Sequence, residues 1–219
     1  MFDAVYVIHL PDAKRKRHID GELAKAGLSA TFIHAAPPAP DFTMSNMRRN
    51  PRGEFGCGMS HIKAIAHALA SGARCPLFLE DDIRWRVDGL SRLRAAYDEL
   101  PADWDVLYLG GHPREACEMV SPHLARVGKF SFAEAYCIAG HAIPAFLAYW
   151  CDRIGQHYAM IDFILGEFAA LNNGFAVYPT VTEQVPGWSE IGQKDEDKSG
   201  LIERGWRKNL CQKPSSKFR

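Results

Sequence analysis

Three acidic side chains follow an apolar run near the middle of this 219-residue chain. Residues 76–79 read Pro-Leu-Phe-Leu, and Glu80, Asp81 and Asp82 come directly after them. Open α/β sheets bind ligands at the carboxyl ends of their strands, and adjacent carboxylates repel one another unless a cation compensates them. Because side chains alternate along an extended chain, we expect Glu80 and Asp82 on one side and Asp81 on the other. The pattern predicts a Mg²⁺ or Mn²⁺ site at Glu80 and Asp82, with a solvated acidic strand end as the alternative.

A second segment, residues 53–61, is rich in glycine and ends in Ser60 and His61. Glycine lets a backbone approach a ligand closely, and the N-terminus of a helix favours an anion. A run with helical spacing over residues 54–73 places Ser60 and His61 near the start of a predicted helix. No Gly-Lys-Ser/Thr follows, so the segment is not a Walker A loop. The alternative is structural, with Ser60 as an N-cap and His61 as a hydrogen-bonded core residue.

Apolar runs alternate with stretches of helical spacing, and this alternation predicts the scaffold. A strand, a helix and a second strand open the chain, which is typical of an α/β fold with parallel strands. Residues 36–53, which contain several prolines, predict a long loop that is either a flap over an active site or a plain surface connection. The expected strands are residues 5–10, 31–35, 76–79, 105–109, 135–139 and 176–178, and the expected helices are residues 14–25, 54–73, 90–100, 143–153 and 160–171.

Composition narrows the class of protein. Hydrophobic residues make up 47% of the chain, which is enough for a real core and excludes global disorder. The 26 Lys and Arg balance the 26 Asp and Glu, so we expect no nucleic-acid partner. Six cysteines without a Cys-x-x-Cys pair, and the lack of a run of about 20 apolar residues, predict a soluble cytoplasmic protein with free thiols.

The chain turns basic near its end, which predicts a boundary between two regions. We expect one domain over residues 1–191, followed by a charged loop and a basic, partly disordered tail over residues 192–219. Such a tail offers at most a peripheral contact with an anionic membrane surface. The sequence leaves the oligomeric state open.

Taken in order, several segments resemble glycosyltransferase family 25, which includes lipooligosaccharide and collagen galactosyltransferases. Residues 77–82 match its Leu-x-Leu-Glu-Asp-Asp motif, the counterpart of the Asp-x-Asp metal motif, and residues 56–61 resemble its Gly-Cys-x-x-Ser-His motif. Residues 7–10 with Arg17 resemble its opening, although His9 stands in place of the usual Asn. The resemblance covers about nine-tenths of the chain. Further matching segments are residues 104–110, 135–138, 161–162, 178–179, 184 and 189–191.

This resemblance implies a GT-A type, Rossmann-like fold with a mixed, mostly parallel sheet flanked by helices. It also implies a UDP-sugar donor, a Mg²⁺ or Mn²⁺ cofactor and inverting transfer of a hexose, with galactose favoured, to a glycan or glycolipid acceptor in lipopolysaccharide or other surface-glycan synthesis. Asp162 is the candidate base for the acceptor hydroxyl, with a helix N-cap as its alternative. Arg17 is a candidate nucleotide contact, with a solvated helix face as its alternative. The implied donor-binding residues are Leu10, Arg17, Ser60, His61, Asp81, Gly110, Gly111, Gln184 and Ser189.

Two other functions compete with this interpretation. A metal-dependent phosphohydrolase or nucleotidyltransferase would use the same acids at the end of the strand. A non-catalytic member of the family would bind a sugar nucleotide or a glycan without transfer. Turnover of a UDP-sugar, compared with simple phosphate release or with binding alone, discriminates among the three.

Overall fold

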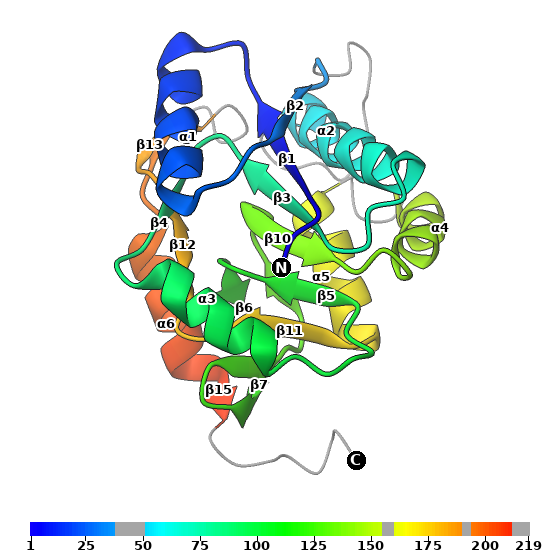
Figure 1. Ribbon diagram of the computed structural model, residues 1–219, viewed down its shortest axis with the longest axis vertical. Helices are drawn as coiled ribbons and strands as arrows, with labels where there is room; N and C mark the ends of the chain where they lie inside the picture. The colour runs from blue at the N-terminus through cyan, green and yellow to red at the C-terminus, as the bar shows by residue number, and fades with distance from the viewer. Residues whose placement is uncertain (38–50, 155–159, 190–193, 212–219) are drawn as a thin grey trace.

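A mixed nine-stranded sheet forms the centre of the fold (Figure 1). The structure is a computed structural model that describes residues 1–37, 51–154, 160–189 and 194–211. Seven of these nine strands run in one direction, while β8 and β10 run in the opposite one. The strands, in their order across the sheet, are β15 (Leu210–Cys211), β7 (Cys117–Ser121), β8 (Leu124–Arg126), β11 (Gly174–Val177), β5 (Val106–Tyr108), β10 (Ala135–Ile138), β3 (Pro76–Glu80), β1 (Ala4–His9) and β2 (Thr31–His34).

Helices cover both faces of this sheet, so the expected mixed, mostly parallel α/β architecture is confirmed. In Figure 1, α3 crosses in front of the sheet and α5 lies behind it. The helices α2, α4 and α5 contact one another and form one layer. The described helices are α1 (Ala13–Ala26), α2 (Pro51–Ala70), α3 (Gly89–Asp98), α4 (Ile143–Arg153), α5 (Ile161–Leu171) and α6 (Ser199–Asn209).

Short strand pairs complete the fold and lie next to the main sheet. Their lengths of two or three residues leave little periodicity to detect, and the sequence analysis missed them. They pair β4 (Ile83–Trp85) with β12 (Thr182–Gln184), β13 (Gly187–Ser189) with β14 (Lys194–Glu196), and β6 (His112–Pro113) with β9 (Phe130–Ser131).

The core lies around β1, β3 and β10, whose apolar side chains are almost fully buried. Phe78 of β3 stacks between Tyr6 of β1 and Tyr136 of β10, with ring centroids 5.7 and 5.2 Å away. Burying one large apolar side chain contributes about 1.5–3 kcal/mol. The strand that ends in the acidic residues is therefore anchored at the centre of the sheet.

The structure differs from the sequence analysis at the start of α2. The helix begins at Pro51 rather than at residue 54, and the glycine-rich segment is its first two turns. A Cβ on Gly56 would lie 3.0 Å from the carbonyl oxygen of Ala36, so this glycine permits close packing of α2 on the chain after β2. Residues 38–50 of the expected flap lie outside the described residues.

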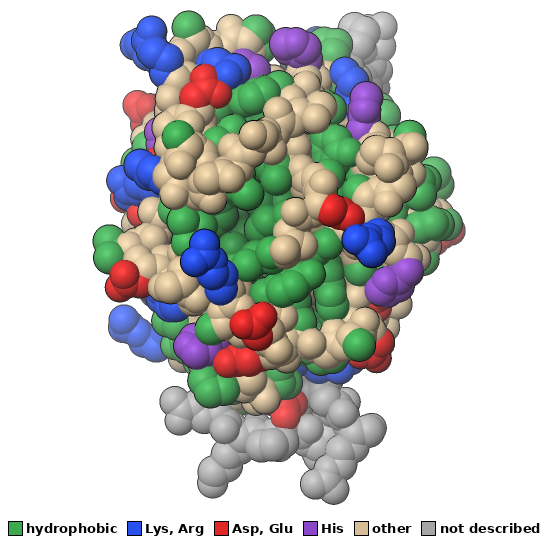
Figure 2. Space-filling view, viewed as in Figure 1, with side chains coloured by type: hydrophobic (Ala, Val, Ile, Leu, Met, Phe, Trp, Pro, Cys, Tyr) green, Lys and Arg blue, Asp and Glu red, His purple; other side chains and the backbone are tan. Residues whose placement is uncertain are grey.

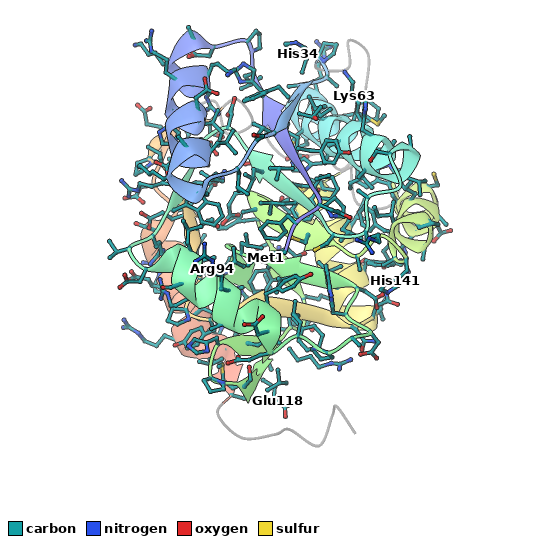
Figure 3. The ribbon with its side chains drawn as sticks, in the orientation of Figure 1. Met1, His34, Lys63, Arg94, Glu118 and His141 are labelled. Carbon is teal, nitrogen blue, oxygen red and sulfur yellow. The ribbon has the colours of Figure 1, made fainter. Side chains whose placement is uncertain are left out.

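The region after residue 191 also differs from the expected loop and tail. Its described part forms β14, α6 and β15, and β15 pairs with β7 as a strand of the main sheet. Ile202 and Trp206 of α6 are buried against the core. Residues 212–219 lie outside the described residues. In Figure 3, the labelled His34 lies on the edge strand β2, and the labelled Glu118 lies on β7, the strand next to the opposite edge strand β15.

The surface carries mixed charges on the face that Figure 2 displays. Lys and Arg are interspersed there with Asp and Glu, mainly around the margin, and hydrophobic side chains gather over the middle. Within the described residues, no helix combines the length and apolarity needed to cross a membrane.

Candidate active site

A cavity of about 840 Å³ lies at the carboxyl ends of β1 and β3. Its volume falls in the range of small-molecule sites, and its place at the ends of parallel strands is where open α/β sheets bind ligands. Residues from α1, α2, α5, β3, β12, β13 and the chain leading into α6 line it. The charged side chains in this lining include Lys14, Arg15, Glu80, Asp81, Asp82, Asp162, Glu196 and Lys198.

Asp81 points away from its two acidic neighbours and holds the turn after β1. Its Oδ2 accepts a hydrogen bond from the backbone N–H of Leu10 at 2.8 Å and is 3.1 Å from Nδ1 of His9. Its Oδ1 accepts a hydrogen bond from Nη1 of Arg15 at 2.7 Å. The buried carboxylate thus positions the β1–α1 turn at the rim of the cavity.

Glu80 and Asp82 face the same group, as the alternation along the strand predicts. Nε2 of Gln184 donates to Oε2 of Glu80 at 2.7 Å and lies 3.4 Å from Oδ1 of Asp82. Nζ of Lys198 in turn donates to Oε1 of Gln184 at 2.8 Å. The two carboxylates therefore share one side of the strand end, and Gln184 lies in the site as expected.

The electrostatics of the cavity are those of a buried acidic cluster with partial compensation. Burial, together with the negative charge of Glu80, raises the pKa of Asp82 to about 7. Burial and Glu80 also raise the pKa of Asp162. Burial would raise the pKa of Glu80, but the combined effect of His61, Lys198 and Arg15 outweighs burial, and the pKa is lowered.

Lys198 supplies positive charge inside this cluster. Burial alone would lower the pKa of its ammonium, but the carboxylates of Glu80 and Asp162 hold that pKa above its ordinary value. The carboxylates of Glu80 and Asp82 share one side of the strand end, and burial together with the charge of Glu80 raises the pKa of Asp82 to about 7. Such a set of oxygen donors fits a hard divalent cation. The residues expected to hold Mg²⁺ or Mn²⁺ thus suit that ion.

The arginine in the cavity is Arg15 and not Arg17. Nη1 of Arg15 lies 2.7 Å from Asp81 and 3.4 Å from Asp82, whereas Arg17 lies on the exposed face of α1 and does not line the cavity. Two residues along an α-helix correspond to a rotation of about 200°, so only one of these arginines can face the sheet. The structure thus places Arg17 on the solvated helix face that was its alternative, and Arg15 supplies the guanidinium in the cavity.

Ser60 and His61 lie well inside α2, which begins at Pro51, so the helix N-terminus supplies no anion site at these two residues. Oγ of Ser60 donates to the carbonyl of Gly56 at 2.6 Å and accepts from the backbone N–H of Ala36 at 2.8 Å. The imidazole of His61 is fully buried, 2.9 Å from Tyr136 Oη and 3.3 Å from Glu80 Oε1. Ser60 still lines the cavity, while His61 contacts Glu80 from the buried side of α2.

Asp162 lies in the first turn of α5 with its side chain at the cavity. Its N-cap alternative is wrong, because Met160 is the N-cap and makes no side-chain cap. The backbone N–H of Phe132 hydrogen-bonds to the carboxylate of Asp162, which orients it. A carboxylate with a raised pKa in a ligand cavity is suited to accept a proton.

The glycines at residues 110 and 111 have a packing role. Neither lines the cavity, whereas Ser189 does. A Cβ on Gly110 would clash with the side chains of Glu134 and Thr182, and Gly111 adopts a φ of +114°. The expectation that these glycines contact the donor has no support from their positions.

Two charged residues at or near the site, Lys198 and Glu134, were not predicted from the sequence. Lys198 lies in a charged stretch that is typical of a surface loop, and no local signal separates it from its exposed neighbours. Glu134 directly follows a segment of alternating apolar residues. Because an acid is rarely buried, its place beside such a segment could have indicated an unusual buried carboxyl.

Known proteins resemble this chain in sequence over about two thirds of its length. Probable inactive glycosyltransferase 25 family member 3 of Bos taurus is 26% identical over 163 residues, which are 63% of this chain. Procollagen galactosyltransferase 2 of Mus musculus is 26% identical over 167 residues, which are 65% of this chain. The matched regions span about a quarter of those longer proteins, 27% and 26% respectively. No family model matches the chain.

Solved structures give weaker similarity. A197 from STIV aligns with a TM-score of 0.44 at 12% identity over 79% of this chain and 80% of that protein. A glycosyltransferase involved in the glycosylation of the major capsid of PBCV-1 aligns with a TM-score of 0.42 at 9% identity over 74% of this chain and 72% of that protein. The sequence relatives, which are named as a glycosyltransferase 25 family member and a procollagen galactosyltransferase, confirm the resemblance to glycosyltransferase family 25 that the motifs predict.

Proposed function

We propose that this protein is an inverting glycosyltransferase of the GT-A type that moves a hexose, galactose favoured, from a UDP-sugar to a hydroxyl of a glycan or glycolipid. The observation that carries this proposal is the cavity at the end of β3, where Glu80 and Asp82 share one side and Asp162, with a raised pKa, also lines the wall. The proposal places the protein in the cytoplasm, in lipopolysaccharide or other surface-glycan synthesis.

The chain's own residues divide the work of binding and proton transfer. Lys198 and Arg15 place positive charge where a diphosphate leaving group gains negative charge, and such preorganised charge lowers the barrier. Asp162 accepts the proton of the acceptor hydroxyl, which frees that oxygen to attack the anomeric carbon as the bond to the diphosphate breaks. A Mg²⁺ or Mn²⁺ ion held by Glu80 and Asp82 would neutralise diphosphate charge as a Lewis acid.

UDP binding measured by calorimetry tests the proposal. Binding is expected in the presence of Mn²⁺ and is expected to weaken strongly in EDTA. Asp82→Ala should abolish the metal-dependent part, whereas Asp98→Ala, which changes an exposed acid on α3, should leave it intact. Equal UDP affinity with Mn²⁺ and with EDTA would exclude the metal assignment, and no binding of any nucleotide sugar would exclude the function.

A second candidate is a non-catalytic protein that binds a sugar nucleotide or glycan. Two relatives are named as inactive or probably inactive members of the family, and this observation favours it. Turnover of a UDP-sugar across a panel of acceptors decides between the two. Metal-dependent UDP binding without transfer or hydrolysis would support the non-catalytic function.

A further inference from the structure

Cys57, His61 and Glu80 bring three different donor groups together beside the cavity. Cys57 and His61 are four residues apart on α2, so their side chains project from the same face of the helix. Each residue offers one donor atom, and these three atoms, a sulfur, a ring nitrogen and a carboxylate oxygen, all lie within 4.8 Å of one another. Cys57 and Glu80 also line the cavity, so a ligand entering it can reach this cluster.

The separation of His61 and Glu80 is compatible with two ligands of a tetrahedral metal ion. Nε2 of His61 lies 3.3 Å from Oε1 of Glu80. Two ligands at ordinary Zn–N and Zn–O distances and a tetrahedral angle are separated by about 3.3–3.5 Å. A charge-assisted N–H···O⁻ bond is shorter, at about 2.7–2.9 Å. The observed separation of 3.3 Å is compatible with two ligands of one ion and is longer than an ordinary charge-assisted hydrogen bond.

A buried partner orients the imidazole of His61 for ligation. Its Nδ1 lies 2.9 Å from Tyr136 Oη, and both residues are fully buried. The two rings also stack, with centroids 5.7 Å apart. When Nδ1–H donates to Tyr136, the lone pair of Nε2 faces Glu80. Histidine ligands are commonly held in this way by a hydrogen bond to the second ring nitrogen.

We propose that Cys57, His61 and Glu80 form a site for a thiophilic divalent cation, with Zn²⁺ favoured. Sulfur and nitrogen donors suit Zn²⁺ and do not suit Mg²⁺, which prefers oxygen. The site differs from the oxygen site at Glu80 and Asp82, because Oε1 of Glu80 faces His61 while Oε2 faces Gln184. Three protein ligands beside a cavity leave the fourth position for water or a ligand oxygen. This proposal does not depend on transferase activity.

Cobalt spectroscopy of the metal-stripped full chain tests this site directly. Co²⁺ should bind with a thiolate-to-cobalt absorption band in the near ultraviolet that saturates at one equivalent, and Zn²⁺ should then remove the band. A wild-type protein that shows no such band overturns the proposal without recourse to any variant.

Matched variants assign the ligands. Cys57→Ser should remove the thiolate band and weaken Zn²⁺ binding at least tenfold, whereas Cys151→Ser, at an exposed position on α4, should retain both. Asp82→Ala should also retain the band while losing metal-dependent UDP binding, which separates this site from the proposed donor site. Persistence of the band in folded Cys57→Ser, verified by circular dichroism, would refute the ligand assignment. If Cys57→Ser does not fold, Cys57→Ala and His61→Gln provide the same comparison.

Discussion

The carboxyl group of Glu134 should make the stability of this protein fall with rising pH. The side chain is fully buried beside β10, and within the described residues neither oxygen accepts a well-formed hydrogen bond from another residue. Burial, supported by the negative charges of Glu80 and Asp162, raises its pKa from an ordinary 4.5 to about 8. The folded state therefore keeps this proton at neutral pH, while the unfolded state has lost it.

The sign and size of the effect follow from this difference in proton binding. Between pH 4.5 and about 8 the folded state binds more protons at Glu134 than the unfolded state, so the free energy of unfolding decreases as pH rises. The full difference between the two pKa values corresponds to about 5 kcal/mol in the free energy of unfolding. Between about pH 5.5 and 8.5, Glu134 alone should lower the free energy of unfolding by about 3 kcal/mol.

Urea unfolding of the wild type and of Glu134→Gln at those two pH values measures this contribution. Gln keeps the shape but cannot titrate, so the wild type should lose about 3 kcal/mol more than the variant across the window. Other titrating groups are common to both proteins and largely cancel in the comparison. Glu203→Gln, at an exposed position on α6, should follow the wild type. Parallel pH dependence for wild type and Glu134→Gln would show that the buried carboxyl is ionised, and would refute the reasoning.

Three further outcomes are expected. Arg15→Ala should weaken UDP binding by at least tenfold in calorimetry, while Arg17→Ala should leave it unchanged, and the reverse result would restore the original assignment. Asp162→Asn should lower the transfer rate by about two to four decades with donor binding near normal, and should remove the rise in wild-type rate as pH increases through the raised pKa of Asp162. Gly110→Ala should destabilise the fold by about 1–3 kcal/mol in urea unfolding through overpacking, whereas Gly21→Ala, with open space around it, should not.

Local features of the sequence account for much of the scaffold. The apolar residues before Glu80 predict β3 because a buried parallel strand needs apolar side chains on both faces. Gly27 adopts a φ of +64° and ends α1 as expected, since a left-handed C-cap favours glycine. Alternation of side chains past the end of β3 predicts that Glu80 and Asp82 meet one group, Gln184, while Asp81 binds the backbone of Leu10, and the structure agrees. Each of these features depends on residues that are close together in the chain, so the local sequence pattern is enough to predict it.

The sequence by itself therefore determined the central strands, most helices and the position of the acidic cluster at a strand end. Only the tertiary structure decided which groups meet that cluster, because Gln184 contacts Glu80 across 104 positions and Lys198 comes from a stretch with surface composition. Likewise, burial that depends on the packing of several elements raises the pKa of Glu134, and the turn of α2 brings Cys57 and His61 to Glu80. Periodicity indicates which side of an element is buried, whereas distance and desolvation between remote residues arise only when the elements pack.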